Sequence, residues 1–463
     1  MLKKFRENYN KEMLLVIWAL AWPTMLEQLM HTAVQYIDTA MVGSLGTQAT
    51  AAVGSTSTVA WLIGSTVSAV SIGFLSFIAR ACGAKDEKGA KHAASQAVLA
   101  TLVVGILLTV VVLSVSGLVP VWMQVDPAIQ DIASLYFFIL YMPMLPRTAS
   151  IIFGTVLRAA GDTKSPMKIG VIVNVINVVL NFLLIYPMRT ISIFGLSIPM
   201  IGAGMGVIGA AVASAISFTV GGLLITLVVY KHPLVSFKGQ SLKPDFNILK
   251  PCLKVAFPNM LQRFGTSLGY VAFASMINSL GEISTAAHTI ANTVESAFYI
   301  PGYGMQTAAA TLAGNAYGAN DAKKMKSLSN MFIPLEIFLM AISGGLLFVL
   351  APTLMSIFSK STEVVALGST VLRMVAVSEP FYGYSIIVEG FMQGVGRTKE
   401  PFIYNVVGMW FVRIVGTFIC IKYFNLGLVS AWACMIAHNM LLFGLFVVCY
   451  IKGKWNPLKE QLV

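Results

Sequence analysis

Four polar side chains follow one another at helical spacing in an otherwise apolar stretch near the amino end. They lie four, four and three residues apart and are Glu27, His31, Gln35 and Asp38. On a helix this spacing places them on one face, and a polar face of a membrane helix is expected to line a protein interior or a water-filled cavity. Glu27 and His31 are candidates for a proton shuttle or for hydrated cavity lining.

Asp38 is the main candidate for chemistry on this face. A lone carboxylate in a cavity of low dielectric constant can hold either a proton or a Na⁺, and either one stores a single positive charge. The alternative is a structural carboxylate that is hydrogen-bonded to a neighbouring helix.

A second polar face is predicted further along the chain. Asn174, Asn177 and Asn181 are spaced three and four residues apart, so a helix presents all three on one side. Amide oxygens are hard donors that suit Na⁺, and amides also hydrogen-bond neighbouring membrane helices. A cation site and plain interhelical contacts both remain open.

The composition indicates that these faces belong to a membrane protein. Of the 463 residues, 57% are hydrophobic and 11% are charged, against about 25% charged residues in an average soluble chain. A helix that crosses a bilayer needs roughly 20 apolar residues. We therefore predict an all-α polytopic membrane protein with twelve transmembrane helices, near residues 13–36, 51–79, 93–119, 132–155, 169–187, 206–230, 251–277, 285–312, 328–350, 365–388, 402–421 and 427–451.

The distribution of basic residues predicts the orientation of these helices. The net charge is +12, but the basic residues gather in every second loop rather than in one nucleic-acid-binding patch. Lys85 and Lys88 lie in one such loop and Lys323 and Lys324 in another, whereas the opposite loops hold only scattered cations such as Arg189. Because lysine and arginine favour the cytoplasmic side, we predict a cell (inner or plasma) membrane protein with both termini in the cytoplasm.

The two halves of the chain repeat each other. A shift of 235 residues aligns Pro23 with Pro258 and Gly161 with Gly396. After the fifth run the shift falls to 221, so the first half carries fourteen extra residues within 189–204. Each half has six runs, an even number, which predicts a parallel repeat with a central site between two lobes. The predicted division is an amino-terminal six-helix lobe at 1–232, a cytoplasmic linker at 233–249 and a carboxyl-terminal six-helix lobe at 250–463.

Several motifs resemble the MATE (multidrug and toxic compound extrusion) family. They are the stretch Tyr36–Gly43 around Asp38, the loop Gly83–Asp86, and the paired segments Ala160–Lys164 and Val395–Lys399. The resemblance covers nearly the whole chain and includes the number of spans and the repeat. It implies two six-helix bundles around a central cavity, rocking alternating access, and export of organic, often cationic, compounds in exchange for Na⁺ or H⁺.

The resemblance also implies which residues bind the coupling cation. Asp38 matches the acidic residue of the family's first helix, and Asn177 matches an asparagine of the fifth. Asn181 stands where many relatives have aspartate, a departure that leaves Na⁺ versus H⁺ open. Ser214 falls where relatives supply a hydroxyl ligand. We predict that Asp38, Asn177 and Asn181 form one cluster able to hold Na⁺, with Ser214 beside it.

The carboxyl-terminal half is predicted to differ chemically. The repeat counterpart of Asp38 is Phe273, and the acids that one branch of the family carries in helices 7 and 10 correspond here to Thr266 and Tyr382. The chain thus resembles the branch that lacks those acids. Glu389 is predicted either to attract a cationic substrate or to form a salt bridge with an arginine. The candidates for lining the cavity are Glu27, His31, Gln35, Thr266, Tyr382 and Glu389.

Other functional classes fit the sequence less well. The five histidines form no convergent set of base, nucleophile or metal ligands, and no nucleotide-binding motif is present. We therefore predict neither an enzyme nor a cofactor-dependent protein. A flippase for a lipid-linked or amphipathic precursor is the alternative within transport. The expected partners are small organic compounds and membrane lipid, without nucleic acid or nucleotide, and the transported ion is Na⁺ or H⁺.

Overall fold

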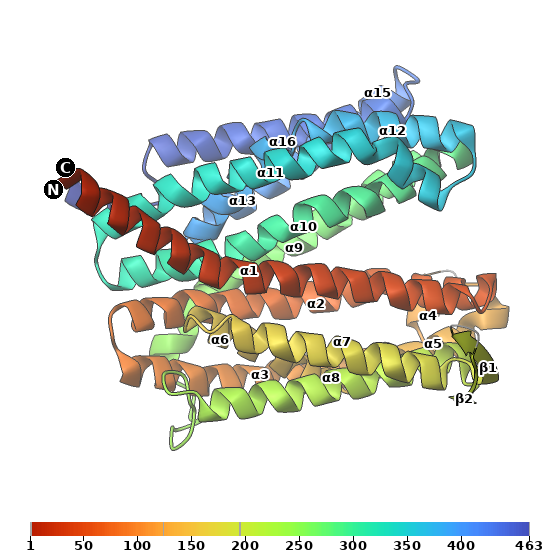
Figure 1. Ribbon diagram of the computed structural model, residues 1–463, viewed down its shortest axis with the longest axis horizontal. Coiled ribbons are helices and arrows are strands. Elements are labelled where there is room, and N and C mark those ends of the chain that lie inside the picture. Colours follow the sequence, from red (N-terminus) through yellow and green to blue (C-terminus); the bar gives the residue numbers. More distant parts are fainter. Residues whose placement is uncertain (1, 124, 194–195, 463) are drawn as a thin grey trace. The chain divides into compact units, whose positions relative to one another are not determined.

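The computed structural model describes residues 2–123, 125–193 and 196–462, with side chains described except at 2–10, 47, 55–58, 60, 190–198 and 462. Long helices dominate the described chain (Figure 1). The first half consists of α1 (Leu2–Gly43), α2 (Thr47–Gly83), α3 (Glu87–Val115), α4 (Val119–Trp122), α5 (Pro127–Tyr141), α6 (Met144–Ala159), α7 (Lys164–Leu184), β1 (Pro187–Ile193), β2 (Leu196–Ala203) and α8 (Gly206–Lys231). The second half consists of α9 (Phe246–Asn278), α10 (Glu282–Gly318), α11 (Ala322–Phe358), α12 (Thr362–Ala376), α13 (Glu379–Gly394), α14 (Lys399–Val407), the π-helical turn η1 (Gly408–Ile414), α15 (Val415–Lys422), α16 (Leu428–Ile451) and the 3₁₀ turn η2 (Lys459–Leu462).

Each of the twelve predicted spans coincides with helical structure. Among the described residues, eight helical stretches are long and apolar enough to cross a membrane by themselves. Two more spans are broken helices, because α5 and α6 meet at 49° and α12 and α13 at 52°. At the first bend Pro143 stands between the helices, where it lacks the N–H that a continuous helix needs. The remaining two, α9 and α10, are 33 and 37 residues long but carry more polar side chains.

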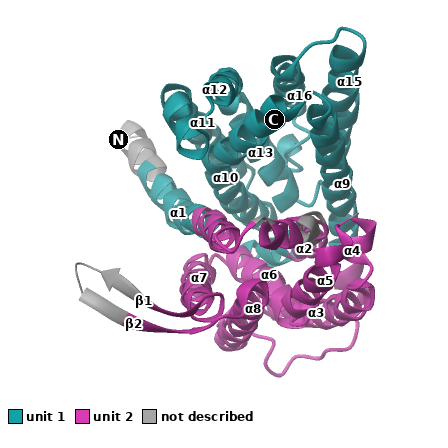
Figure 2. Cartoon of the chain, turned by 90° about the vertical axis from the view of Figure 1, so that its right-hand side faces the viewer, with its two compact units in different colours: residues 1–28, 75–86, 251–463 teal, residues 29–74, 87–250 magenta. Residues whose placement is uncertain are grey.

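The described chain divides into two compact units (Figure 2). One unit contains residues 1–28, 75–86 and 251–463, and the other contains residues 29–74 and 87–250. We call them the carboxyl unit and the amino unit. The boundaries fall inside α1 and α2, so the units differ from the predicted lobes at residues 1–28 and 75–86. The division into lobes at 1–232 and 250–463 remains a prediction.

Each unit has a helical core of its own. In the amino unit α8 packs against α5, α6 and α7, and α3 packs against α6. In the carboxyl unit α10 packs against α11 and α13, and α13 packs against α16. The beginning of α1 joins this second core, where Ile17 and Ala21 are fully buried. The site described below lies on the helices of the amino unit.

The fourteen extra residues of the first half belong to a two-stranded hairpin. β1 pairs antiparallel with β2, with Ile193 opposite Leu196 and Arg189 opposite Met200. The sequence analysis located this insertion but predicted no strand in it. The alternation of threonine, isoleucine, serine and isoleucine at 190–193 is typical of a short strand. The all-helical fold therefore carries one small β element outside its spans.

Candidate functional site

The structure joins the four residues of the predicted cation site in one chain of hydrogen bonds. Asn181 Nδ2 donates to Asp38 Oδ1 at 2.5 Å and lies 3.1 Å from Asn177 Oδ1. Asn177 in turn donates through Nδ2 to Ser214 Oγ at 3.0 Å. Asp38 comes from α1, the two asparagines from α7 and Ser214 from α8, so the bonds connect three helices of the amino unit.

Close packing of α7 against α8 positions part of this cluster. A Cβ atom at Gly209 of α8 would lie 2.5 Å from the carbonyl oxygen of Leu184 at the end of α7. Glycine therefore permits a helix separation that any other residue would prevent, as small residues commonly do between membrane helices. On α7, the spacing of four residues turns Asn177 and Asn181 toward the same side. The local sequence thus places both amides at a tight interface.

Burial determines what the cluster can bind. Asn177, Asn181 and Ser214 are 4%, 0% and 8% exposed, whereas Asp38 is half-buried. Asn181 Oδ1 has no hydrogen-bond partner among the described residues. Leaving such an oxygen unpaired costs about 1–3 kcal/mol. It is an unoccupied acceptor on the same side chain that donates a hydrogen bond to the Asp38 carboxylate. Asp38 can accept a proton, and the neighbouring oxygens are of the hard kind that Na⁺ takes as ligands.

The cluster contains a single ionisable group. In the part of the chain that the structure describes, no group of three or more His, Cys, Asp or Glu side chains is placed to hold a metal ion. The oxygens of the hydrogen-bonded chain next to Asp38 belong to two amides and a hydroxyl, and the phenol of Tyr136 on α5 also interacts electrostatically with Asp38. The arrangement therefore suits one monovalent charge, carried by H⁺ or Na⁺, rather than a tightly bound divalent ion.

The rest of the polar face of α1 extends from Asp38 toward the amino end. Gln35 and His31 are exposed and Glu27 is half-buried. Glu27 belongs to the carboxyl unit and His31 to the amino unit, since the boundary falls between Gln28 and Leu29. Glu27, His31 and Gln35 thus lie on one face of α1, and their roles remain predictions.

Glu389 is hydrogen-bonded by three amides, and Arg263 interacts with it electrostatically without a direct contact. Its Oε1 accepts from Gln262 Nε2 at 2.9 Å and from Gln393 Nε2 at 3.1 Å, and its Oε2 accepts from Asn405 Nδ2 at 3.2 Å. No arginine lies within ion-pair distance of this carboxylate among the described residues. The sequence analysis missed these partners. Only Gln393 gave a usable signal, because it follows Glu389 by four residues on the same helix.

Thr266 and Tyr382 carry hydroxyl groups at the two positions that the sequence resemblance aligned with acids of one branch of the family. Thr266 Oγ1 donates to the carbonyl oxygen of Gln262 in its own helix at 2.8 Å. The hydroxyls of Tyr382 and Tyr303 lie 2.8 Å apart, and the ring of Tyr299 packs edge-on against both at centroid distances of 6.1 and 6.0 Å. Tyr382 thus belongs to a group of three tyrosines, and such rings attract organic cations.

The repeat counterpart of Asp38 is Phe273, and an arginine stacks on its ring. The guanidinium carbon of Arg413 is 4.1 Å from the ring centroid of Phe273 and 4.8 Å from that of Tyr270. Phe273 and Arg413 are 1% and 3% exposed. Arg413 lies in η1, a π-helical turn that packs against α16. Where the first half has an acid, the second half therefore has an aromatic residue with a cation stacked on it.

In the part of the chain that the structure describes, helical spans in two similar halves, each with a carboxylate held by amides, define a polytopic membrane transport protein. The family model described as MatE matches residues 23–183 and 258–419, once in each half. The chain therefore belongs to the MatE family. It is a multi-pass membrane transporter and not an enzyme, and the predicted fold class and repeat are confirmed.

Relatives extend over nearly the whole chain. A probable multidrug resistance protein NorM from Thermotoga maritima is 27% identical, with 94% of this chain and 92% of the relative covered. The human multidrug and toxin extrusion protein 1 is 24% identical over 97% of this chain and 77% of its own. The solved structure of a MOP superfamily transporter from Pyrococcus furiosus has a TM-score of 0.87 at 24% identity, with 96% of each chain covered. That structural likeness supports the fold.

Proposed function

We propose that this transporter exports small organic compounds, mainly cationic and drug-like, in exchange for Na⁺ or H⁺ moving inward through the cell membrane. The observation that carries the proposal is the chain of hydrogen bonds from Asp38 through Asn181 and Asn177 to Ser214. The relative from Thermotoga maritima, a probable multidrug resistance protein, supports the substrate class. Both termini are proposed to be cytoplasmic.

The cluster links the charge of Asp38 to the contact between α1 and α7. The ionised carboxylate accepts the Asn181 amide, and a hydrogen bond to a charged group contributes about 1.5–3 kcal/mol. A proton or Na⁺ at Asp38 neutralises this charge and weakens the bond, and the vacant Oδ1 of Asn181 can then face Na⁺. An ion that interacts differently with two conformations shifts their populations. We propose that this shift drives rocking alternating access.

The substrate is proposed to meet aromatic rings and a carboxylate in the carboxyl unit. Tyr299, Tyr303 and Tyr382 offer ring faces, and Glu389 offers a carboxylate that accepts hydrogen bonds from amides. Cation–π attraction and one carboxylate suit varied organic cations better than a single rigid ligand. The polar face of α1 with Glu27, His31 and Gln35 is proposed to line the path.

The test is dye efflux from proteoliposomes that contain the full-length protein. Wild type is compared with Asp38→Asn, which keeps the shape of the side chain and removes its charge, under separately imposed inward H⁺ and Na⁺ gradients. Asp131→Asn is the matched control, because Asp131 is an exposed carboxylate on α5. We expect one gradient to drive efflux of a cationic dye by wild type and by Asp131→Asn, and Asp38→Asn to lose at least tenfold in rate.

The two gradients identify the coupling ion, and the variants test the site. Equal gradient-driven efflux by wild type and Asp38→Asn would show that Asp38 is only structural. Efflux by all three proteins without any cation gradient would contradict ion coupling as a whole.

A further inference from the structure

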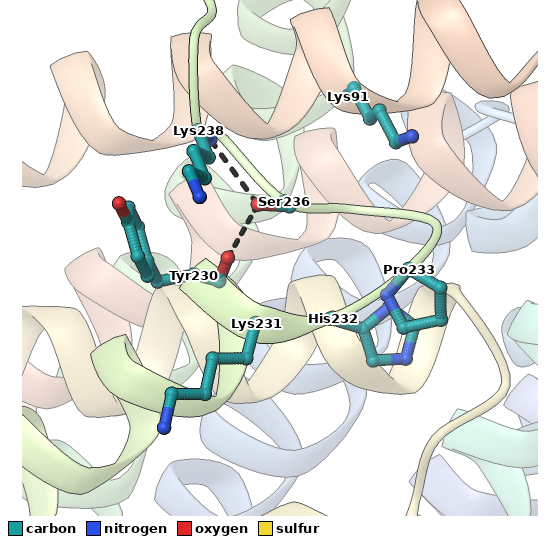
Figure 3. A pocket seen from close by; sticks show the side chains of 7 residues that line it. All are labelled: Lys91, Tyr230, Lys231, His232, Pro233, Ser236 and Lys238. Carbon is teal, nitrogen blue, oxygen red and sulfur yellow. Dashed lines mark hydrogen bonds between the residues drawn. The ribbon is translucent and has the colours of Figure 1, made fainter.

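A basic pocket lies in the amino unit where α8 ends and the following segment folds back (Figure 3). It has a volume of about 520 Å³, in the range of small-molecule sites. Three of its lining residues are lysines, Lys91 from α3 together with Lys231 and Lys238, and no acidic residue lines it. The coupling mechanism uses none of these residues.

The segment that closes this pocket is held in one conformation. Ser236 Oγ donates to the carbonyl oxygen of Tyr230 at 2.5 Å and accepts from the backbone N–H of Lys238 at 3.2 Å. The ring of Phe237 lies between Phe153, at 6.3 Å, and Tyr230, at 5.5 Å. The backbone of Lys238 is held by the hydrogen bond to Ser236, and its ammonium lies 6.0 Å from the ring centroid of Tyr230, whereas Lys231 ends α8.

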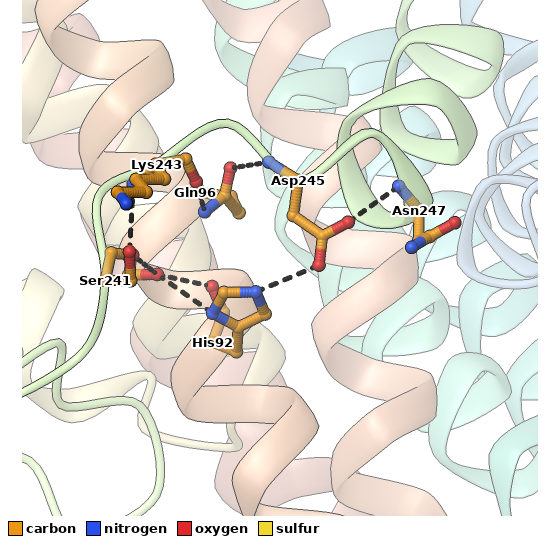
Figure 4. A network of polar contacts seen from close by, with 7 residues as sticks. His92, Gln96, Ser241, Lys243, Asp245 and Asn247 are labelled. Carbon is orange, nitrogen blue, oxygen red and sulfur yellow. Dashed lines mark hydrogen bonds and ion pairs between the residues drawn. The ribbon is translucent and has the colours of Figure 1, made fainter.

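A second set of contacts fastens the continuation of the segment to α3 (Figure 4). Gln96 donates through Nε2 to the carbonyl oxygen of Lys243 and accepts from the backbone N–H of Asp245, both at 3.0 Å. His92 Nε2 lies 3.0 Å from Asp245 Oδ2. Because His92 and Gln96 follow Lys91 on α3, the same helix carries one pocket lysine and anchors the segment that carries another. The contact with His92 also occupies one oxygen of the Asp245 carboxylate.

The remaining titratable groups leave the pocket positive. Burial lowers the pKa of His232, and the charge of Asp162 opposes this only in part. The neutral ring accepts the backbone N–H of Leu234 at Nδ1, so its proton is at Nε2, which is a donor. Asp162 itself accepts from the backbone N–H of Ser165 at the start of α7. The lining thus carries three lysines and one N–H donor, with the Asp162 carboxylate as the nearby acid.

We propose that this pocket binds a phosphate group, the group that an anionic phospholipid presents at the membrane surface. Lysines bind phosphate as compact point charges, and the pocket lies at the end of a membrane-spanning helix, on the side predicted to be cytoplasmic. Basic pockets between helices on that side are typical sites for anionic head groups. A bound head group would connect α3 to the end of α8.

The test measures thermal midpoints of the purified full-length protein in detergent with four added probes. They are phosphatidylglycerol, phosphatidylcholine, glycerol 3-phosphate and inorganic phosphate. The pocket variant carries Lys91→Gln, Lys231→Gln and Lys238→Gln. The control variant carries Lys88→Gln, Lys164→Gln and Lys168→Gln, three exposed lysines outside the pocket, so that both variants lose the same net charge.

We expect phosphatidylglycerol to raise the Tm of wild type and control saturably, and phosphatidylcholine to have a smaller effect. Apparent affinity should fall roughly fivefold for each pocket lysine removed, and about a hundredfold in the pocket variant. Saturable stabilisation by glycerol 3-phosphate or inorganic phosphate at equal concentration would assign the site to a soluble phosphate instead of a lipid.

Equal responses of the pocket and control variants to phosphatidylglycerol would overturn the proposal. Should the triple pocket variant fail to purify, Lys238→Gln alone tests the site, with Lys168→Gln as its control. The expected difference between these two is then about fivefold in apparent affinity.

Discussion

At the scale of single residues, the amide of Asn181 is the centre of the cation cluster. It donates to Asp38, lies within hydrogen-bond distance of Asn177 and keeps its own oxygen unpartnered. Asn181 can donate to Asp38 when the carboxylate is ionised, and it can offer its free oxygen to Na⁺ when the carboxylate is neutralised. Removing it should therefore alter coupling more than folding.

The variant Asn181→Ala is expected to reduce gradient-driven export by about tenfold or more, because a hydrogen bond to a charged group is worth about 1.5–3 kcal/mol. Initial efflux rates at several concentrations of the driving cation measure this loss. Asn174→Ala, two turns earlier on the same face of α7, should retain export within about twofold. Equal losses in both variants would indicate a general defect of α7.

Unlike Asp38, Glu336 is a fully buried acid whose carboxyl oxygens have no hydrogen-bond partner among the described residues. It lies in α11 and is 0% exposed. A Cβ atom at Gly302 would lie 2.6 Å from Glu336 Oε1, so glycine at that position makes room for the carboxyl group. Such a group destabilises the fold relative to an apolar side chain of the same length.

Glu336→Met is therefore expected to stabilise the protein by about 1–3 kcal/mol, the usual penalty of an unsatisfied buried polar group. Its Tm in detergent should rise relative to wild type. Glu336→Gln keeps a polar group at the same place and should give no comparable gain. A fall in Tm for Glu336→Met would show that the carboxyl group is paired in solution.

At the scale of elements, the sequence predicted what depends on local patterns. Apolar runs located all twelve spans, and the change of shift in the repeat located the insertion at 189–204. Which side chains hydrogen-bond to each other depends on contacts between distant parts of the chain, and local sequence patterns do not reveal these contacts. Asp38 and Asn181 are 143 residues apart in the chain, and Glu389 and Gln262 are 127 apart. The family pattern grouped the first pair, whereas nothing in the sequence indicated the second.

The segment between α8 and α9 gives a prediction that depends on pH. The backbone N–H of Asn247 and the ring of His92 lower the pKa of Asp245 below its ordinary value of about 3.9. The contact therefore stabilises the segment above about pH 4 and is lost as the pH falls through the lowered pKa. Hydrogen-exchange protection of 241–247, corrected for intrinsic rates, should be constant from pH 5 to 8 and fall below pH 4.

Asp245→Asn removes the charge and should reduce this protection already at pH 7. Asp131→Asn, at an exposed carboxylate on α5, should leave it unchanged. Protection at 241–247 that is the same in wild type and Asp245→Asn at every pH would show that Gln96 alone fastens the segment.

At the scale of the whole molecule, the two halves share a fold but differ in charge. The amino-terminal half carries Asp38 with its amide partners, and at the matching position the other half carries Phe273 with Arg413 stacked on it. Arg413 carries a fixed positive charge there, and the buried acid Glu295 interacts with it electrostatically. On the proposed mechanism, the repeat supplies two similar bundles for the movement, and the Asp38 cluster is the coupling site.

One coupling cation per cycle makes a prediction about membrane potential. When one monovalent cation enters and one monovalent organic cation leaves, no net charge crosses the membrane. We expect export of such a substrate to be unchanged, within about twofold, between zero and −100 mV inside. A neutral substrate moves one net charge, worth about 2.3 kcal/mol at 100 mV, so its steady accumulation should rise about fiftyfold. Proteoliposomes clamped with valinomycin and K⁺ allow both measurements on one preparation. If −100 mV raised export of the monovalent cation by about fiftyfold, one net charge would accompany it. A second coupling cation would then be required, and the acids of the carboxyl unit would have to provide its site.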